Sequence, residues 1–150
     1  MTHEEKIAAL TGEYLQVSQY TLYTAFKAAE VYVQSLKNTA YRHGSEELNL
    51  AYASADTKLK ESQGASDKEL LTYFQDKGFS IKILKGLEQL LKDRSYFISS
   101  FFISHSSDFA SQDVKAYDDI IAEIQSLITR AVKLNQELSK TLDKVSSLYY

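Results

Sequence analysis

The residues most able to do chemistry are gathered in one stretch, residues 92–102, which reads Lys-Asp-Arg-Ser-Tyr-Phe-Ile-Ser-Ser-Phe-Phe. Within it, Asp93 and Arg94 interrupt an otherwise apolar helical pattern. A guanidinium group offers five N–H donors in a fork that matches a phosphate or a carboxylate. Because a buried unpaired charge is too costly to keep, Arg94 must lie at the rim of the fold or against a carboxylate. The simpler interpretation is a surface arginine whose aliphatic stem covers the core.

A second titratable candidate is His105, which follows Arg94 by eleven residues. In a continuous helix this spacing returns the histidine to nearly the same face, but about 16 Å further along the axis. That separation is too large for both side chains to act on one phosphate within a single chain. Two alternatives stay open: a partly exposed histidine at a helix end, or a site completed by His105 of a second copy.

The same stretch resembles the signature of HEPN-type helical bundles, which reads Arg-Asn-Tyr-Leu-x-His followed by two aromatic residues. Aligned on Arg94, the match includes Tyr96, Phe97 and the pair Phe101 and Phe102. The order of the expected helices is also similar, with the motif on the helix before a long last one. The resemblance implies an RNA ligand, a homodimer, and a nucleotidyltransferase-type partner encoded beside it, as in toxin–antitoxin pairs.

In active members of that family, an arginine and a histidine cleave RNA without a metal ion. The histidine moves a proton at the ribose 2′-hydroxyl, and the arginine stabilises the phosphate charge. Here the asparagine position is Ser95 and the histidine position is Ser99. A serine without an activating partner is not a base near neutral pH. The resemblance therefore predicts a binding or regulatory protein that uses Arg94, Ser95, Tyr96, Ser99 and Phe102, rather than a ribonuclease.

Two other functions remain as alternatives. The first is a toxin-like, metal-independent endoribonuclease that uses Arg94 with Ser99 or His105 in an altered site. The second is an unrelated helical interaction or immunity protein, in which Arg94 would face open solvent on a monomer. Loss of the motif histidine favours a protein that is not an enzyme.

The first predicted helix opens at a capping box formed by Thr2 and Glu5. Apolar residues step by three and four as far as Arg42 and His43, where Gly44 is the expected stop. The two expected inward faces include Ile7, Leu10, Tyr14, Val17, Ala28 and Val31 on one, and Leu15, Leu22, Phe26, Ala29, Val33 and Leu36 on the other. A helix that is apolar over so wide an arc is expected to be central.

Four further helices are predicted. Ser45 restarts a helix that ends at residues 62–64, and a capping box of Ser66 and Glu69 opens a short one that ends at Gly78. Ser80 caps the helix that carries the motif, whose expected inward residues are Ile83, Leu84, Leu87, Leu90, Leu91, Phe97, Ile98, Phe101 and Phe102. Gly86, inside this helix, suggests the close passage of another backbone.

A polar break at residues 105–108 precedes the last helix, which is expected to run from Ser111 to the end. No segment alternates with a period of two for long enough to predict a strand. The fold class is therefore all-α: a single up-down helical bundle of three long and two short helices, packed antiparallel. We expect one domain over residues 1–150.

The amino-acid composition argues against several classes of ligand and catalytic site. The chain has 150 residues, a formal net charge of −3, and neither proline nor cysteine. Without a basic stripe, a duplex DNA partner is not expected, and without cysteine there is no thiolate nucleophile or zinc–sulfur site. We found no metal or nucleotide motif and expect no cofactor. The absence of a signal peptide and of about 20 consecutive apolar residues predicts a cytoplasmic protein without a membrane segment.

The aromatic content favours a homodimer. Eleven tyrosines are present, and a tyrosine can bury its ring while its hydroxyl stays in water. Together with Phe97, Phe101 and Phe102, they give the aromatic enrichment that is typical of protein interfaces.

Overall fold

The computed structural model describes residues 1–37 and 45–147, so the predicted helix end at Arg42 to Gly44 lies outside the described residues. The described residues form α1 (His3–Lys37), α2 (Ser45–Glu61), α3 (Asp67–Phe74), α4 (Ile81–Tyr96), a π-helical turn η1 (Phe97–Phe101), α5 (Phe102–Ser104), α6 (Ser106–Ser111) and α7 (Val114–Ser146). They contain no strand, which confirms the all-α bundle. None of these helices is long and apolar enough to cross a membrane.

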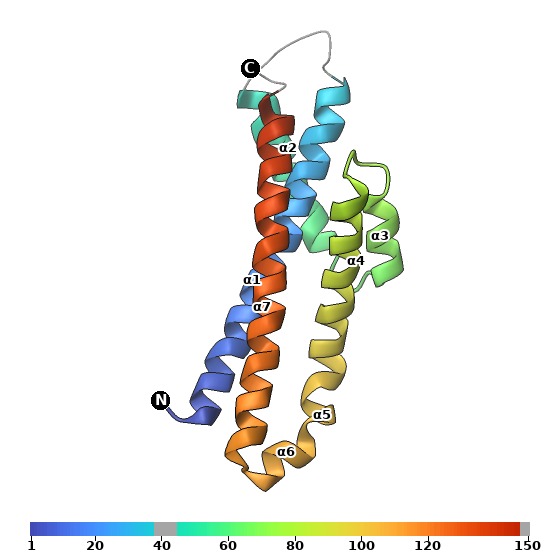
Figure 1. The fold of residues 1–150 in the computed structure, drawn as a ribbon. Helices are drawn as coiled ribbons and strands as arrows, with labels where there is room; N and C mark the ends of the chain where they lie inside the picture. The colour runs from blue at the N-terminus through green and yellow to red at the C-terminus, as the bar shows by residue number, and fades with distance from the viewer. Residues whose placement is uncertain (38–44, 148–150) are drawn as a thin grey trace.

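The long helices alternate in direction along the chain, which places α1 and α7 parallel to each other (Figure 1). His3 Nε2 lies 3.1 Å from Asp118 Oδ1, and the Thr21 hydroxyl donates to the Ala131 carbonyl at 3.2 Å. From the first contact to the second, the residue number increases on both helices, so the two helices run in the same direction. The expectation of antiparallel packing therefore holds for consecutive helices but is wrong for α1 and α7, which form the centre of the bundle.

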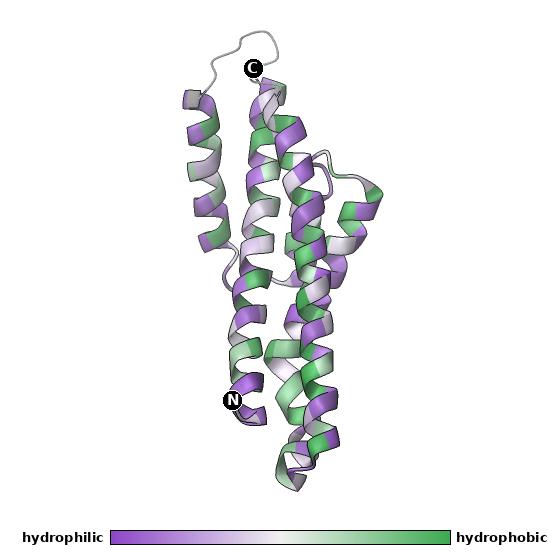
Figure 2. Ribbon diagram, turned by 60° about the vertical axis from the view of Figure 1, so that its left-hand side comes forward, coloured by the Kyte–Doolittle hydropathy of each residue, from purple (hydrophilic) through white to green (hydrophobic). Residues whose placement is uncertain are grey.

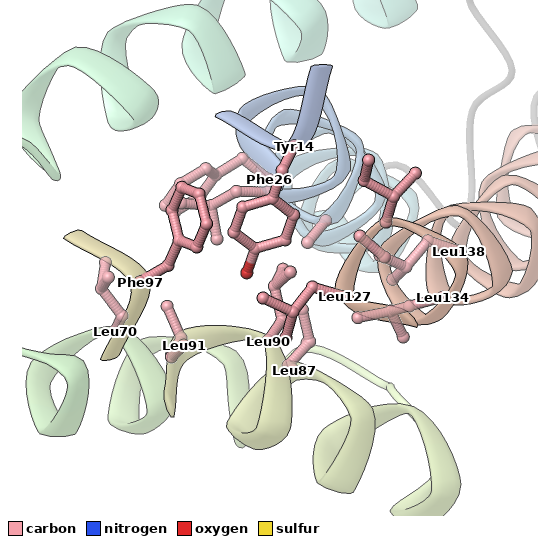
Figure 3. Close-up of a cluster of buried hydrophobic side chains, with 14 of the residues drawn as sticks. Tyr14, Phe26, Leu70, Leu87, Leu90, Leu91, Phe97, Leu127, Leu134 and Leu138 are labelled. Carbon is pink, nitrogen blue, oxygen red and sulfur yellow. The ribbon is translucent and has the colours of Figure 1, made fainter. Parts of the chain in front are cut away.

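The other helices cover this central pair unequally. α3 and α4 lie on one side, while α2 lies beside only the C-terminal half of α1 (Figures 1 and 2). Hydrophilic and hydrophobic residues alternate along the helices in Figure 2, as expected for amphipathic helices. Leucines of α4 and α7 converge with Tyr14 and Phe97 in the core (Figure 3).

Predicted caps define the starts of α1, α3 and α4. The Thr2 hydroxyl accepts from the Glu5 amide at 3.1 Å, and the Ser66 and Ser80 hydroxyls accept from the amides of Glu69 and Ile83, both at 3.2 Å. The last helix begins at Val114 rather than at Ser111. Gln112 adopts a left-handed conformation with φ of 54°, which ends α6, and Asp113 then caps α7.

The helix that carries the motif is not uniform, contrary to expectation. α4 changes at Phe97 into the π turn η1, and α5 ends at Ser104. The wider π turn shifts the periodicity of the residues that follow it. Ile98, near the start of this turn, is 65% exposed, and Phe102, just after it, is 41% exposed, so the prediction that both face inward is wrong. On α1, the predicted inward positions Leu15 and Leu36 are also exposed.

Gly78 permits the turn between α3 and α4. Its φ is +81°, and a Cβ atom there would lie 2.5 Å from the Tyr32 ring. We expect Gly78→Ala to lower the free energy of unfolding by about 2 kcal/mol or more, because backbone strain adds to a ring clash. Gly64→Ala is the matched control, since Gly64 has φ of +87° but no atom within 4 Å of its Cβ position. Chemical denaturation measures both losses, and equal losses would contradict the role of Tyr32.

Candidate functional site

The first three motif residues point to different neighbours. Arg94 is half-buried and its Nη2 donates to Gln19 Oε1 of α1 at 3.3 Å. Ser95 donates instead to Asp67 Oδ2 of α3 at 2.8 Å. Tyr96 turns toward α7, because its hydroxyl lies 3.5 Å from Glu123 Oε1. Consecutive residues on a helix diverge by about 100°, so these three side chains do not converge on one site.

The remaining motif residues lie on the exposed side of η1 and α5. The Ser99 hydroxyl donates to the Ser95 carbonyl at 2.5 Å and lies 3.1 Å from the Ser100 hydroxyl. Neither contact provides a base that could take the proton of Ser99. Phe102 stacks on Phe109 of α6, with ring centroids 5.8 Å apart. The exposed side of η1 and α5 therefore carries hydroxyl and aromatic groups. None of the described contacts of Ser99 activates it as a nucleophile.

Exposed apolar side chains follow Arg94 on η1 and α5, whose ribbons lead to the lower end of the bundle in Figure 1. α4 and α1 run in opposite directions here, and Gln19 contacts Arg94. Leu15, which is 42% exposed, lies four residues before Gln19 on α1, and Ile98 lies four residues after Arg94 on η1. Because α1 and α4 are antiparallel, both residues lie one helical turn from the Gln19–Arg94 contact in the same direction. We infer that they lie on the same side of the line along which α1 and α4 meet.

Two more exposed apolar side chains follow Ile98 along the chain. Phe102 and Ile103 begin α5, about one turn after Ile98, and their side chains diverge by about 100° around the helix axis. Ile103 is 75% exposed. We call Leu15, Ile98, Phe102 and Ile103 the Ile98 face. Helical periodicity does not reveal this face, because it assigns Leu15, Ile98 and Phe102 to the core and gives Ile103 no role.

His105 is held between two carboxylates. Its Nδ1 lies 2.9 Å from Asp108 Oδ2 of α6, and its Nε2 lies 2.9 Å from Glu123 Oε2 of α7. A neutral imidazole has one N–H and cannot donate to both, so the geometry fits the protonated ring. Burial alone would lower the pKa of His105, but hydrogen bonds with Asp108 and Glu123 outweigh it and raise the pKa above its ordinary value. Both ring nitrogens are therefore engaged in joining α6 to α7.

The His105 cluster should make stability depend on pH. Because the folded-state pKa is raised above about 6.5, its contribution is fully present below about pH 6.5 and is lost as the pH rises through the folded-state pKa. We expect His105→Ala to lower the free energy of unfolding more at about pH 5.5 than at about pH 9, because the hydrogen bonds to Asp108 and Glu123 favour the protonated ring. Denaturant titrations at both pH values measure this difference. His3→Ala is the control for an exposed histidine–carboxylate contact, and a pH-independent loss in His105→Ala would contradict the cluster's role.

Asp93 is the more buried member of the Asp–Arg pair in the motif. Its Oδ1 accepts from Gln89 Nε2 at 2.8 Å and from Arg130 Nη2 of α7 at 3.1 Å. Helical spacing indicates that Asp93 faces inward, since it lies three residues after Leu90 and four before Phe97. No local signal identifies Arg130, which is 37 residues away. Arg94 is partly exposed at the rim of the bundle. This is one of the two positions that the sequence predicts for it, the other being against a carboxylate.

Tyr14 lies beside these charges, deep in the core. Its side chain is fully buried, and within residues 1–37 and 45–147 its hydroxyl has no hydrogen-bond partner. Burial and the charge of Asp93 raise its pKa to about 12, although Arg94 and Arg130 oppose the shift. The hydroxyl points between Leu127 and the leucines of α4 (Figure 3). Tyr14 therefore stays protonated near neutral pH and contributes packing.

A second buried carboxylate, Glu30, joins three helices. It accepts hydrogen bonds from the Ser54 hydroxyl of α2 at 3.0 Å and from the Tyr73 hydroxyl of α3. Burial and the hydrogen bond to Glu30 raise the pKa of Tyr73. All of these groups are bound to one another, so we interpret the cluster as structural.

A cavity of about 180 Å³ lies between α4 and α7. Gly86 lines it, and a Cβ atom at this glycine would lie 2.7 Å from Leu134 Cδ1 of α7. The expected close neighbour of Gly86 is therefore a side chain, not a backbone. Across the part of the chain that the structure describes, no group of three or more His, Cys, Asp or Glu residues is placed to hold a metal ion.

Comparison with protein-family models, with curated proteins and with solved structures gives no match to this chain.

Proposed function

We propose that the chain is a HEPN-like helical interaction module that self-associates through the Ile98 face and does not cleave RNA. The observation that supports the proposal most is the exposure of four large apolar side chains on α1, η1 and α5, all within about two helical turns of the Gln19–Arg94 contact. Exposed apolar groups that gather on one face, rather than singly, are typical of protein interaction sites.

The chain segments that carry the Ile98 face contain no acidic, lysine or arginine side chain, and Arg94 lies at their border. No Asp, Glu, Lys or Arg occurs between Ser95 and Ser107, nor on α1 between Tyr14 and Phe26. Depletion of charged residues at the centre and enrichment in aromatic residues distinguish interfaces from the remaining surface. A two-fold dimer brings the same patch of both copies together, so an uncharged patch avoids repulsion between like charges. The composition thus supports a second copy of this chain as the partner.

The motif supports binding rather than catalysis. Ser99 has no activating partner among its described contacts, and both nitrogens of His105 are bound to carboxylates. Arg94 keeps guanidinium N–H groups beyond its single bond to Gln19, at the border of the Ile98 face. It would therefore orient a partner or an anionic group there. A nucleotidyltransferase-type partner and a cytoplasmic location belong to the same proposal.

Sedimentation velocity of the full chain over a range of concentrations tests self-association. We expect a species with twice the mass of the 17.0 kDa chain. A monomer at every concentration would contradict the proposed homodimer. Addition of a nucleotidyltransferase-type protein tests the second partner, which would form a complex of distinct mass.

An RNA cleavage assay tests the absence of catalysis. We expect purified protein, incubated with single-stranded RNA and a chelator, to leave the RNA intact, and Arg94→Ala to behave identically. Lys92→Ala is the matched control, because Lys92 is an exposed cation on the same helix. Metal-independent cleavage that is lost in Arg94→Ala but kept in Lys92→Ala would establish the alternative, a ribonuclease with an altered site.

A further inference from the structure

The cavity between α4 and α7 has the size and lining of a site for a small apolar group. Its volume is about 180 Å³, and its apolar wall includes Ile83, Leu90, Ala131 and Leu134. For comparison, a cavity of about 150 Å³ lined by aliphatic side chains binds benzene. The space therefore fits a single six-membered ring.

Charged groups surround this apolar wall, and most are already paired. Arg130 contacts Asp93 at 3.1 Å, and Lys82 lies 3.9 Å from Glu137. Lys133 also lines the cavity, and no ion pair of it occurs among the described residues. Three cations thus face two carboxylates. The uncompensated charge at the cavity is positive, which favours an anionic ligand group.

Arg130 is suited to hold that group. One terminal nitrogen contacts Asp93, and the side chain is half exposed, so further N–H donors of the guanidinium group face outward. Carboxylates are bound well by such donors. Lys133, three residues further along α7, lies on the same side of the helix.

We propose that this cavity binds a small aromatic carboxylate, whose ring lies against Ile83, Leu90 and Leu134 and whose carboxylate meets Arg130 and Lys133. Gly86 has a direct role in this site. A side chain at that position would displace Leu134, so glycine leaves the cavity wall free for the ring. The site is separate from the Ile98 face and does not depend on the proposed self-association.

Amide chemical shifts of the ¹⁵N-labelled full chain, recorded during titration with phenylacetate, test the proposal. We expect saturable shifts at residues 83–93 and 130–137. Benzylamine, which carries the opposite charge on a similar ring, should bind at least about tenfold more weakly, because it meets the excess positive charge. This comparison uses the unmodified protein, so it does not depend on whether a variant folds.

Two variants locate the site. Lys133→Gln should weaken phenylacetate binding severalfold, whereas Lys140→Gln, an exposed lysine of the same helix outside the cavity, should not. Leu134→Phe should abolish binding by placing a ring in the cavity, with circular dichroism as the check that it folds. No saturable shifts, shifts elsewhere, or equal binding of benzylamine would each overturn the proposal.

Discussion

Aspartate in place of Ile98 is expected to weaken self-association at least about 100-fold, because an unpaired carboxylate buried at an interface costs several kcal/mol. Ile98 is 65% exposed in the single chain, so the free energy of unfolding of the monomer should change little. Sedimentation equilibrium of wild type and variant measures the change in the dissociation constant.

Ile81→Asp is the matched control for this substitution. Ile81 is 73% exposed at the start of the same helix and lies outside the Ile98 face. An aspartate in the first turn of a helix is favourable, so the variant should fold normally. If both variants weaken association equally, the loss reflects added charge rather than the Ile98 face, and the proposed interface is wrong.

Phe101→Ala should be the most destabilising substitution at the lower end of the bundle. Phe101 is fully buried, and its ring lies within 4.9 Å of Phe97 and 5.1 Å of Phe102, measured between centroids. It also contacts the His105 ring. We expect the free energy of unfolding to fall by about 3–5 kcal/mol, because the substitution leaves a cavity beneath η1.

The neighbouring Phe102→Ala variant is the comparison for Phe101→Ala. Phe102 is 41% exposed, and its loss should cost about 1–2 kcal/mol in the monomer. Urea titrations at low protein concentration measure both values. Similar losses for the two variants would mean that Phe101 does not form the core contact assigned to it.

Local sequence signals predicted the helices well because their physical causes are local. Ser66 and Ser80 accept hydrogen bonds from backbone amides three residues ahead, and that geometry depends only on adjacent residues. The apolar residues of α7 follow the same helical period, and Ile120, Ile124 and Leu138 are fully buried. The all-α bundle followed from these patterns.

The candidate site could not be predicted in the same way. A periodicity of 3.6 residues assigned Ile98 to the core, and the π turn in which it lies leaves no clear mark in the sequence. The contact between Asp93 and Arg130, and that between His105 and Glu123, join residues far apart in the chain. Such contacts depend on how α4 and α7 pack, which periodicity does not determine.

A distance measurement between two copies tests the central claim most directly. The chain has no cysteine, so Ser99→Cys provides one attachment point for a spin label beside Ile98. Lys82→Cys provides the control, about 25 Å away along α4 and η1. We predict a short distance between labels at position 99 in the dimer and a much longer one at position 82. A short distance at position 82, or no dipolar coupling between copies at either position, would contradict association through the Ile98 face.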